Sequence, residues 1–148
     1  MSDERKVSVS RVIDATPEAI FDVLADPGKH PIIDGSGMVQ GENFGPDRLA
    51  DGEKFGMKMK YAGFLPYRIT NTVKEFEENK LIAWAHFGKH RWRYELEPVE
   101  GGTKVTETFD WSTSTTPKLI ELMGYPKQHP ANMEATLERL DEYLTTSS

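Results

Sequence analysis

Between Phe55 and Trp111 the chain carries a series of short segments in which apolar and polar residues alternate. This period-two alternation is typical of β-strands that bury one face. The connections between the segments are too short to hold crossover helices, so neighbouring strands must pair antiparallel as a meander. No other feature restricts the fold as strongly, because it fixes both the class of sheet and the order of its strands.

The alternation divides this region into five predicted strands. They are Phe55–Tyr61, Tyr67–Lys74, Leu81–Phe87, His90–Leu96 and Val105–Trp111. The loops between them are rich in Gly, Pro, Asn and charged residues, as expected for turns.

The N-terminal segment predicts one strand followed by a helix. Val7 to Ile13 supplies the strand, and Thr16 is a plausible N-cap with Pro17 at the first helical position. Asp26-Pro27-Gly28 ends the helix, and we expect a loop at His30-Pro31. After Pro31 the chain is loop-rich, with one edge strand expected around residues 38–40.

Helix returns near the C-terminus. Thr116-Pro117 predicts a second helix start, and the segment GYPKQHP (residues 124–130) is expected to interrupt it. From Ala131 onward the apolar residues recur at four, three and four positions, which indicates a helix with one buried side. These residues are Met133, Leu137, Leu140 and Leu144.

One long helix is too narrow to bury the whole inner face of a wide sheet. A single stripe of Leu and Met covers only part of the predicted inner face, so the rest must collapse on itself or enclose a cavity. Polar groups on that face need partners, because leaving one unpaired costs about 1–3 kcal/mol. The polar candidates are His86, Glu107 and the phenols of Tyr61, Tyr67 and Tyr94.

Composition narrows the class of protein. The 148 residues fit a single domain spanning residues 1–148, and 37% hydrophobic with 28% charged residues suits a globular protein. The net charge of −6 argues against nucleic-acid binding and disfavours docking to an anionic membrane. The lack of cysteine excludes disulfides and a thiol nucleophile. With no apolar signal core, we expect a cytoplasmic protein without stable membrane insertion.

Three stretches together resemble a known superfamily. They are DATPEAIFDVLADPGKHP, NTVKEFEENKLIAWAH and WRYELEPVEGGTKVTETFDWS, followed by the terminal helix. Together they resemble the START/Bet v 1-like (SRPBCC) superfamily, and most closely its polyketide cyclase/dehydrase-like branch. The resemblance implies an α+β helix-grip fold, in which a curved antiparallel sheet of about seven strands surrounds a long C-terminal helix and an internal cavity. Members include lipid and sterol carriers, hormone receptors and aromatic-polyketide cyclases, and no catalytic signature carries over residue by residue.

The candidate ligand-binding residues are the inner strand positions and the apolar side of the C-terminal helices. Each has an ordinary core role as the alternative, although methionine also suits an adaptable pocket wall. They are Met57, Met59, Tyr61, Tyr67, Ile69, Trp84, His86, Trp92, Tyr94, Met123, Met133 and Leu137.

The candidate catalytic residues are His86 and Glu107. Strict alternation places Glu107 on the apolar face, where desolvation would raise the pKa of its carboxyl and suit it to proton transfer. A β-bulge that turns Glu107 outward is the alternative.

Other titratable residues have weaker functional interpretations. His86 and His90 flank a predicted Gly88-Lys89 hairpin turn but lack a third ligand, so we expect no metal. His30 is expected to be structural or exposed, or else to lie with Asp34 at a cavity mouth. A cluster of basic and aromatic residues is interpreted as a solvated strand face. Its members are Lys89, Arg91, Trp92 and Arg93.

Three functions follow as hypotheses. The first is binding of a hydrophobic small molecule, such as a lipid, a sterol, a polyketide or another aromatic compound, in the internal cavity. The second is a cyclase or dehydratase that acts on a carbonyl substrate, and the third is a protein-interaction module. No phosphate-binding or dinucleotide motif is present, so no cofactor is expected, and the chain is expected to be a monomer or homodimer.

Overall fold

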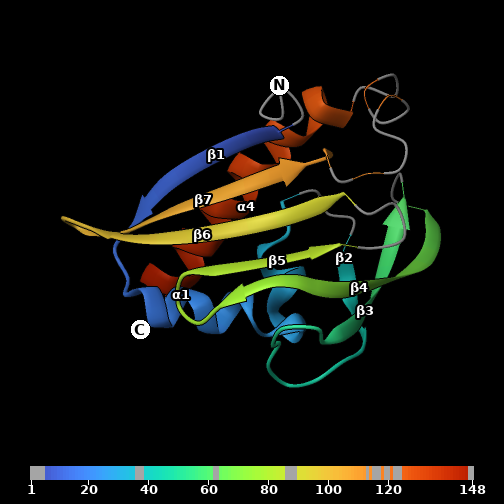
Figure 1. The fold of residues 1–148 in the computed structure, drawn as a ribbon, viewed down its shortest axis with the longest axis horizontal. Coiled ribbons are helices and arrows are strands. Elements are labelled where there is room, and N and C mark those ends of the chain that lie inside the picture. Colours follow the sequence, from blue (N-terminus) through green and yellow to red (C-terminus); the bar gives the residue numbers. More distant parts are fainter. Residues whose placement is uncertain are drawn as a thin grey trace.

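A computed structural model describes residues 6–35, 39–61, 64–85, 90–112, 114, 118, 121 and 125–146. Figure 1 shows a curved sheet with helices on one side. The elements in chain order are β1 (Lys6–Ile13), α1 (Pro17–Leu24), the short 3₁₀ helix η2 (Pro27–Lys29), α2 (His30–Ile33), β2 (Val39–Phe44), β3 (Lys54–Tyr61), β4 (Leu65–Glu77), β5 (Leu81–Ala85), β6 (Arg91–Val99), β7 (Gly102–Asp110) and α4 (Tyr125–Thr146).

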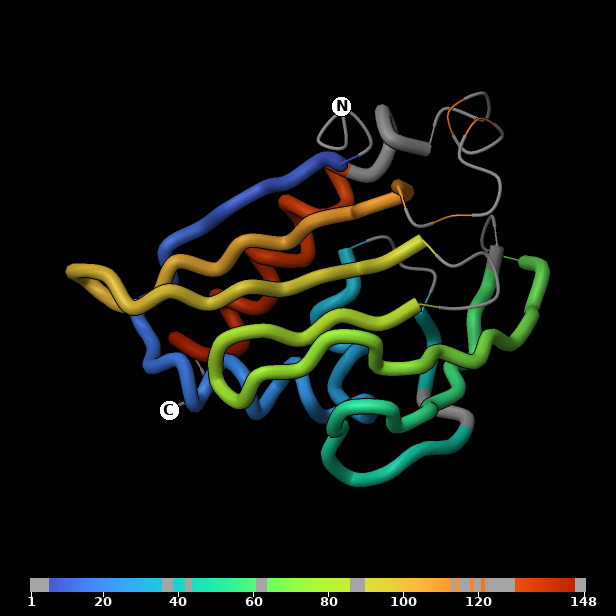
Figure 2. Tube along the Cα trace, in the orientation of Figure 1, coloured from blue at the N-terminus to red at the C-terminus, as the bar shows by residue number. Residues whose placement is uncertain are grey.

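The sheet has seven strands in the order β1-β7-β6-β5-β4-β3-β2, and every neighbouring pair is antiparallel. The predicted meander is therefore confirmed from β3 to β7, the predicted edge strand is β2, and β1 returns to pair with β7. In Figures 1 and 2, α4 lies behind β1, β7 and β6, across the inner face of the sheet. This is the predicted helix-grip fold.

The start of α1 follows from its capping residues. Thr16 Oγ1 accepts a hydrogen bond of 3.2 Å from the backbone N–H of Ala19, and Pro17 occupies the first turn. Asp26 then caps η2 by accepting a 2.9 Å hydrogen bond from the N–H of Gly28. The helix buries four apolar side chains against the sheet, namely Ile20, Phe21, Val23 and Leu24.

Replacing Thr16 by alanine is expected to lower the free energy of unfolding by about 1 kcal/mol, because the N–H of Ala19 loses its acceptor. Thr16→Ser keeps a hydroxyl acceptor and is expected to stay within a few tenths of the wild-type value. Urea unfolding followed by circular dichroism measures both. Equal losses in the two variants would contradict the capping role.

The expected loop at His30-Pro31 is wrong, because these residues begin the helix α2. Pro31 lies in the first turn, where a fixed φ and a missing N–H are compatible with a helix. The turn closes with a 3.0 Å hydrogen bond from the N–H of Asp34 to the carbonyl of His30.

The expected interruption at residues 124–130 is also wrong in part, since α4 runs without a break from Tyr125 through Pro130. Pro130 lies inside α4, where it removes one main-chain hydrogen bond, and the helix continues past it. The predicted apolar side is confirmed, with Met133, Leu137 and Leu140 fully buried. The predicted helix start at Thr116-Pro117 lies outside the described residues.

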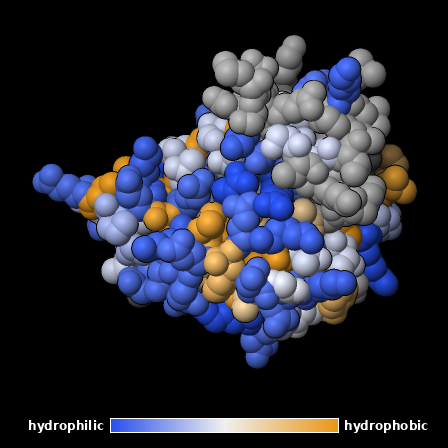
Figure 3. Space-filling view, viewed as in Figure 1, coloured by the Kyte–Doolittle hydropathy of each residue, from blue (hydrophilic) through white to orange (hydrophobic). Residues whose placement is uncertain are grey.

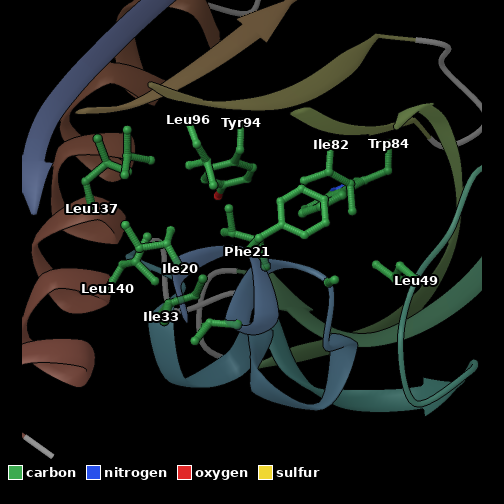
Figure 4. Packing of buried hydrophobic residues seen from close by; sticks show 14 of the residues in the cluster. Ile20, Phe21, Ile33, Leu49, Ile82, Trp84, Tyr94, Leu96, Leu137 and Leu140 are labelled. Atoms are coloured by element: carbon green, nitrogen blue, oxygen red, sulfur yellow. The ribbon is translucent and has the colours of Figure 1, made fainter. Parts of the chain in front are cut away.

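The core consists of two apolar clusters on the inner face of the sheet. Figure 4 shows the larger cluster, in which side chains of α1 and α4 meet those of β5 and β6. The smaller cluster contains Phe109, Trp111 and Met133. Val9 and Trp92 contact both clusters, so the interior is a continuous apolar layer.

The predicted solvated cluster is wrong in part, because Arg91 and Arg93 belong to an ion-pair network on the outer face of the sheet, whereas Trp92 packs against the inner clusters. Lys89 lies outside the described residues. Glu75 binds Arg93 through two hydrogen bonds of 2.9 and 2.8 Å and Arg91 through one of 2.6 Å. Asp110 contacts the same Arg93 at 3.2 Å. Arg91 and Arg93 thus face outward but are paired with carboxylates. The hydrogen bonds from Arg93 and Arg91 lower the pKa of Glu75. In Figure 3, hydrophilic residues cover much of this face.

Candidate functional site between the sheet and the C-terminal helix

Glu107 lies inside the protein, which settles the orientation that the sequence left open. The register pairs Tyr94 of β6 with Glu107 of β7 and Glu107 with Val9 of β1, with no bulge in either ladder. Strict alternation therefore holds, and only 3% of Glu107 is exposed. The carboxyl group lies between the two apolar clusters.

Tyr94 and Glu107 lie directly opposite each other in the β6–β7 ladder and both are buried, so the phenol and the carboxyl group form a pair that faces the same interior. Burial raises the pKa of Glu107 well above its usual value, and the nearby Asp34 carboxylate raises it further, while the nearby phenol of Tyr94 acts in the opposite direction. Burial also raises the pKa of Tyr94, with added contributions from Glu107 and Asp34. The pair therefore holds its protons strongly.

One oxygen of this pair lacks a partner. Within the described residues, Glu107 Oε1 is buried and forms no hydrogen bond. Leaving such an atom unsatisfied costs about 1–3 kcal/mol, and buried polar atoms without partners are uncommon. The free oxygen is thus an unused hydrogen-bonding position in an apolar interior.

Asp34 is held near the pair by contacts at the end of α2. Its Oδ2 accepts a 2.9 Å hydrogen bond from the N–H of Val39, and its carbonyl accepts one of 2.8 Å from Arg139. The next residue, Gly35, donates its N–H to Thr136 Oγ1 at 2.8 Å. These bonds tie the segment after α2 to α4, and they fix a negative charge beside the interior.

Aromatic rings line the interior beside Tyr94. Trp84 stacks on His30 with ring centroids 4.8 Å apart, and its centroid lies 5.6 Å from that of Tyr94. Phe55 meets the Trp84 ring edge-on at 5.5 Å. These contacts make one continuous wall of four rings.

His30 is a structural residue, as one of the sequence interpretations held, but it is not exposed. It is 7% exposed, and its Nε2 donates a 2.8 Å hydrogen bond to the carbonyl of Leu24. Burial lowers the pKa of this imidazole, which favours the neutral ring. Its stacking on Trp84 was missed by the sequence analysis, because no local pattern marks a buried histidine.

The structure brings most of the predicted ligand-binding residues together. Met57, Trp84, Tyr94 and Leu137 belong to the larger cluster, with Met59 and Ile69 packed at its edge. Trp92 lies where the clusters meet, and Met133 belongs to the smaller one.

Four predicted residues lie elsewhere or cannot be placed. Tyr67 is 37% exposed. It lies near the N-terminal end of β4 and belongs to neither apolar cluster. The side chain of Tyr61 and the residues His86 and Met123 lie outside the described part of the chain. His86 is therefore not placed relative to Glu107.

The described residues hold neither a cluster of metal ligands nor a membrane-spanning helix. No group of three or more His, Cys, Asp or Glu side chains there is arranged to hold a metal ion. No helix in that part is both long and apolar enough to cross a membrane.

Comparison with known proteins identifies relatives of the whole fold. The uncharacterized protein Rv0088 of Mycobacterium tuberculosis is 42% identical over 144 residues, covering 93% of this chain and 64% of its own length. The chain thus spans less than two thirds of that relative. A crystal structure of a Rhodobacter sphaeroides protein matches with a TM-score of 0.74 at 19% identity, covering 97% of this chain and 94% of that one.

The solution structure of an AHSA1-like protein from Aeromonas hydrophila matches with a TM-score of 0.70 at 22% identity, covering 96% of this chain and 93% of that one. The family model described as "Polyketide cyclase / dehydrase and lipid transport" matches residues 4–145. The chain therefore belongs to this polyketide cyclase/dehydrase and lipid transport family of the SRPBCC superfamily.

Proposed function

We propose that the protein binds a largely apolar small molecule between the sheet and α4, with the Tyr94–Glu107 pair holding a polar group of that molecule. The observation that carries the proposal is the buried Oε1 of Glu107, which has no partner among the described residues. A ligand oxygen would satisfy this atom. The family description, which includes lipid transport, supports the same class of function.

The chemistry of the pair favours one class of ligand over others. A protonated carboxyl group both donates and accepts a hydrogen bond, so a hydroxyl or a carbonyl group suits it. A carboxylate ligand suits it less well, because Asp34 already places a negative charge nearby. The surrounding walls offer aromatic rings and the flexible thioethers of Met57 and Met133. Sterols, neutral lipids and aromatic polyketides meet these requirements.

The test is ligand-dependent stabilisation of the folded protein. Cholesterol, monoolein and the anthraquinone emodin are titrated separately, and at least one is expected to raise the melting temperature in a concentration-dependent manner. Native mass spectrometry of the gently purified protein detects any molecule that remains bound. A lack of shift with all three probes and a mass equal to that of the bare chain would contradict the proposal.

Two substitutions locate the polar contact. Glu107→Leu removes both hydrogen-bonding oxygens and is expected to weaken binding about tenfold, since a lost hydrogen bond to a ligand is worth about 1.5 kcal/mol. Glu107→Gln keeps a donor and an acceptor and is expected to bind within about threefold of wild type. Equal affinity in the wild type and the leucine variant would place the ligand elsewhere.

A cyclase or dehydratase activity is the second candidate, and the raised pKa of Glu107 favours it specifically. A carboxyl group whose pKa is raised keeps its proton to a higher pH than an exposed one, so it can protonate a substrate carbonyl or a leaving hydroxyl group. In that case Glu107→Gln would retain binding but lose turnover of a poly-β-keto substrate. The same variant therefore separates a carrier from an enzyme.

A further inference from the structure

The end of the β3–β4 hairpin exposes apolar side chains beyond the core. Phe64 is 75% exposed, Leu65 53% and Tyr67 37%. In Figures 1 and 2 this green hairpin forms the right-hand end of the molecule, and Figure 3 shows apolar surface along the same edge. Exposed apolar side chains that gather at one end of a molecule are a feature that contact surfaces share.

The same hairpin is strongly basic within an acidic protein. Residues 54–70 contain Lys54, Lys58, Lys60 and Arg68 and no Asp or Glu, although the whole chain has a net charge of −6. Within the described residues, none of these four side chains forms an ion pair. The positive charge is therefore available to an external anion.

The strand register adds to this charge. Lys58 of β3 lies directly opposite Arg68 of β4, and like charges in a cross-strand pair destabilise a sheet. Lys60 follows on the same face, opposite Pro66. This arrangement costs stability when the protein is alone, and an anionic partner would remove that cost.

The apolar and basic groups occupy opposite faces of the hairpin. Met59 pairs with Tyr67, and Leu65 lies two residues before Tyr67 on the same face, whereas Lys58, Lys60 and Arg68 fall at the alternate positions. The tip is thus apolar, with cations behind it on one side. An interfacial membrane anchor combines these two features, because its apolar groups enter the acyl boundary and its cations meet lipid phosphates.

We propose that the β3–β4 hairpin docks the protein peripherally on an anionic lipid bilayer. Phe64 and Leu65 enter the headgroup region, and Lys58, Lys60 and Arg68 contact lipid phosphates. The overall negative charge does not oppose this, because charges farther away than the Debye length of about 8 Å are screened at physiological salt. Binding of a nucleic acid explains the cations but leaves the two most exposed apolar residues without a role.

This proposal goes beyond the proposed ligand binding and does not depend on it. The sequence argument against docking on an anionic membrane rested on the net charge of the whole chain, whereas the hairpin is a local surface of opposite sign. The separate argument against stable membrane insertion does not concern docking at the surface.

The first experiment is vesicle flotation with the full chain. Vesicles of phosphatidylcholine alone are compared with vesicles containing equal parts of phosphatidylcholine and phosphatidylglycerol. The wild type is expected to partition at least about tenfold more strongly onto the anionic vesicles, and the preference is expected to fall as salt is raised. Absence of binding to anionic vesicles at low salt would overturn the proposal.

Matched double variants then assign the surface. Lys58→Glu with Lys60→Glu, and separately Phe64→Ser with Leu65→Ser, are each expected to reduce partition at least about tenfold, since one basic residue contributes roughly fivefold. The control is Val12→Ser with Lys104→Glu. Val12 is 53% exposed and pairs with Lys104 near the β6–β7 turn, at the opposite end of the sheet.

The control is expected to bind like the wild type. Equal losses in the control and the hairpin variants, or no loss in either hairpin variant, would overturn the assignment. Circular dichroism confirms that each variant is folded.

A tryptophan probe gives an independent readout that does not rely on loss of binding. Phe64→Trp is expected to shift its fluorescence to shorter wavelength with anionic vesicles and to be quenched by brominated lipid acyl chains. Val12→Trp serves as the control and is expected to show neither change. Quenching of both probes, or of neither, would contradict insertion by the hairpin tip.

Discussion

Replacing Glu107 by glutamine is expected to remove a loss of stability that the wild type undergoes as pH rises. Burial and the charge of Asp34 raise the pKa of Glu107 in the folded state well above its value in the unfolded chain. The folded protein therefore keeps a proton that the unfolded chain releases above about pH 4.3.

The sign of the effect follows from the proton count. Between the unfolded and folded pKa values of Glu107, the folded state binds one more proton than the unfolded state. The free energy of unfolding must then fall with rising pH, by about 1.4 kcal/mol per pH unit. Glutamine does not titrate, and its amide oxygen can accept a hydrogen bond from the opposing Tyr94 phenol as a carboxyl oxygen can. The free energy of unfolding of the variant, relative to that of the wild type, therefore increases as the pH rises.

The measurement is urea unfolding of both proteins from pH 5 to pH 8, with the difference between them plotted against pH. Using the difference cancels contributions from groups common to both, such as Glu75 and Asp110, whose pKa values are lowered. Glu95→Gln is the matched control, since Glu95 is exposed on the opposite face of β6 from Tyr94. Parallel curves for Glu107→Gln and the wild type would show that Glu107 is not protonated in the folded protein.

Much of the fold could be predicted because antiparallel strands with one buried face follow a strict alternation. The inward position of Glu107 followed from counting along the strand, and the long apolar side of α4 followed from its spacing. Capping of α1 by Thr16 was also predictable, because capping depends on neighbours in sequence.

Features that depend on distant parts of the chain could not be predicted. A bulge between Val73 and Glu75 shifts the alternation of β4, so Glu75 pairs with Ala83 on the outer face and reaches the arginines of β6. The small side chains of Ala83 and Ala85 on β5 lie between these partners. The sequence showed the basic residues but not the carboxylate across β5.

The site illustrates the same limit. Alternation indicated Tyr94 and Glu107 separately as inward polar residues, but their pairing depends on the register between β6 and β7. The contribution of Asp34 depends on hydrogen bonds that hold the end of α2 against α4. Long-range packing therefore decides which of the predicted polar residues act together.

Replacing Gly102 by alanine is expected to destabilise the protein by about 2–5 kcal/mol, the sum of a strained backbone and a steric overlap. Gly102 has a φ of 142°, which side-chain-bearing residues rarely adopt. A Cβ at this position would overlap the carbonyl oxygen of Ile13 at the end of β1. Because Ile13 pairs with Thr103, backbone movement to relieve the overlap disturbs the join between β1 and β7.

The neighbouring Gly101 separates the two contributions. It also has a positive φ, 92°, but a Cβ there meets nothing within 4 Å. Gly101→Ala is therefore expected to cost only the backbone strain of about 1–2 kcal/mol. Urea unfolding of both variants measures the difference, and equal losses would exclude the overlap with Ile13. If the overlap operates, hydrogen exchange of Gly102→Ala should accelerate first at the β1 amides paired with β7, since β1 is the edge strand that this contact holds in place.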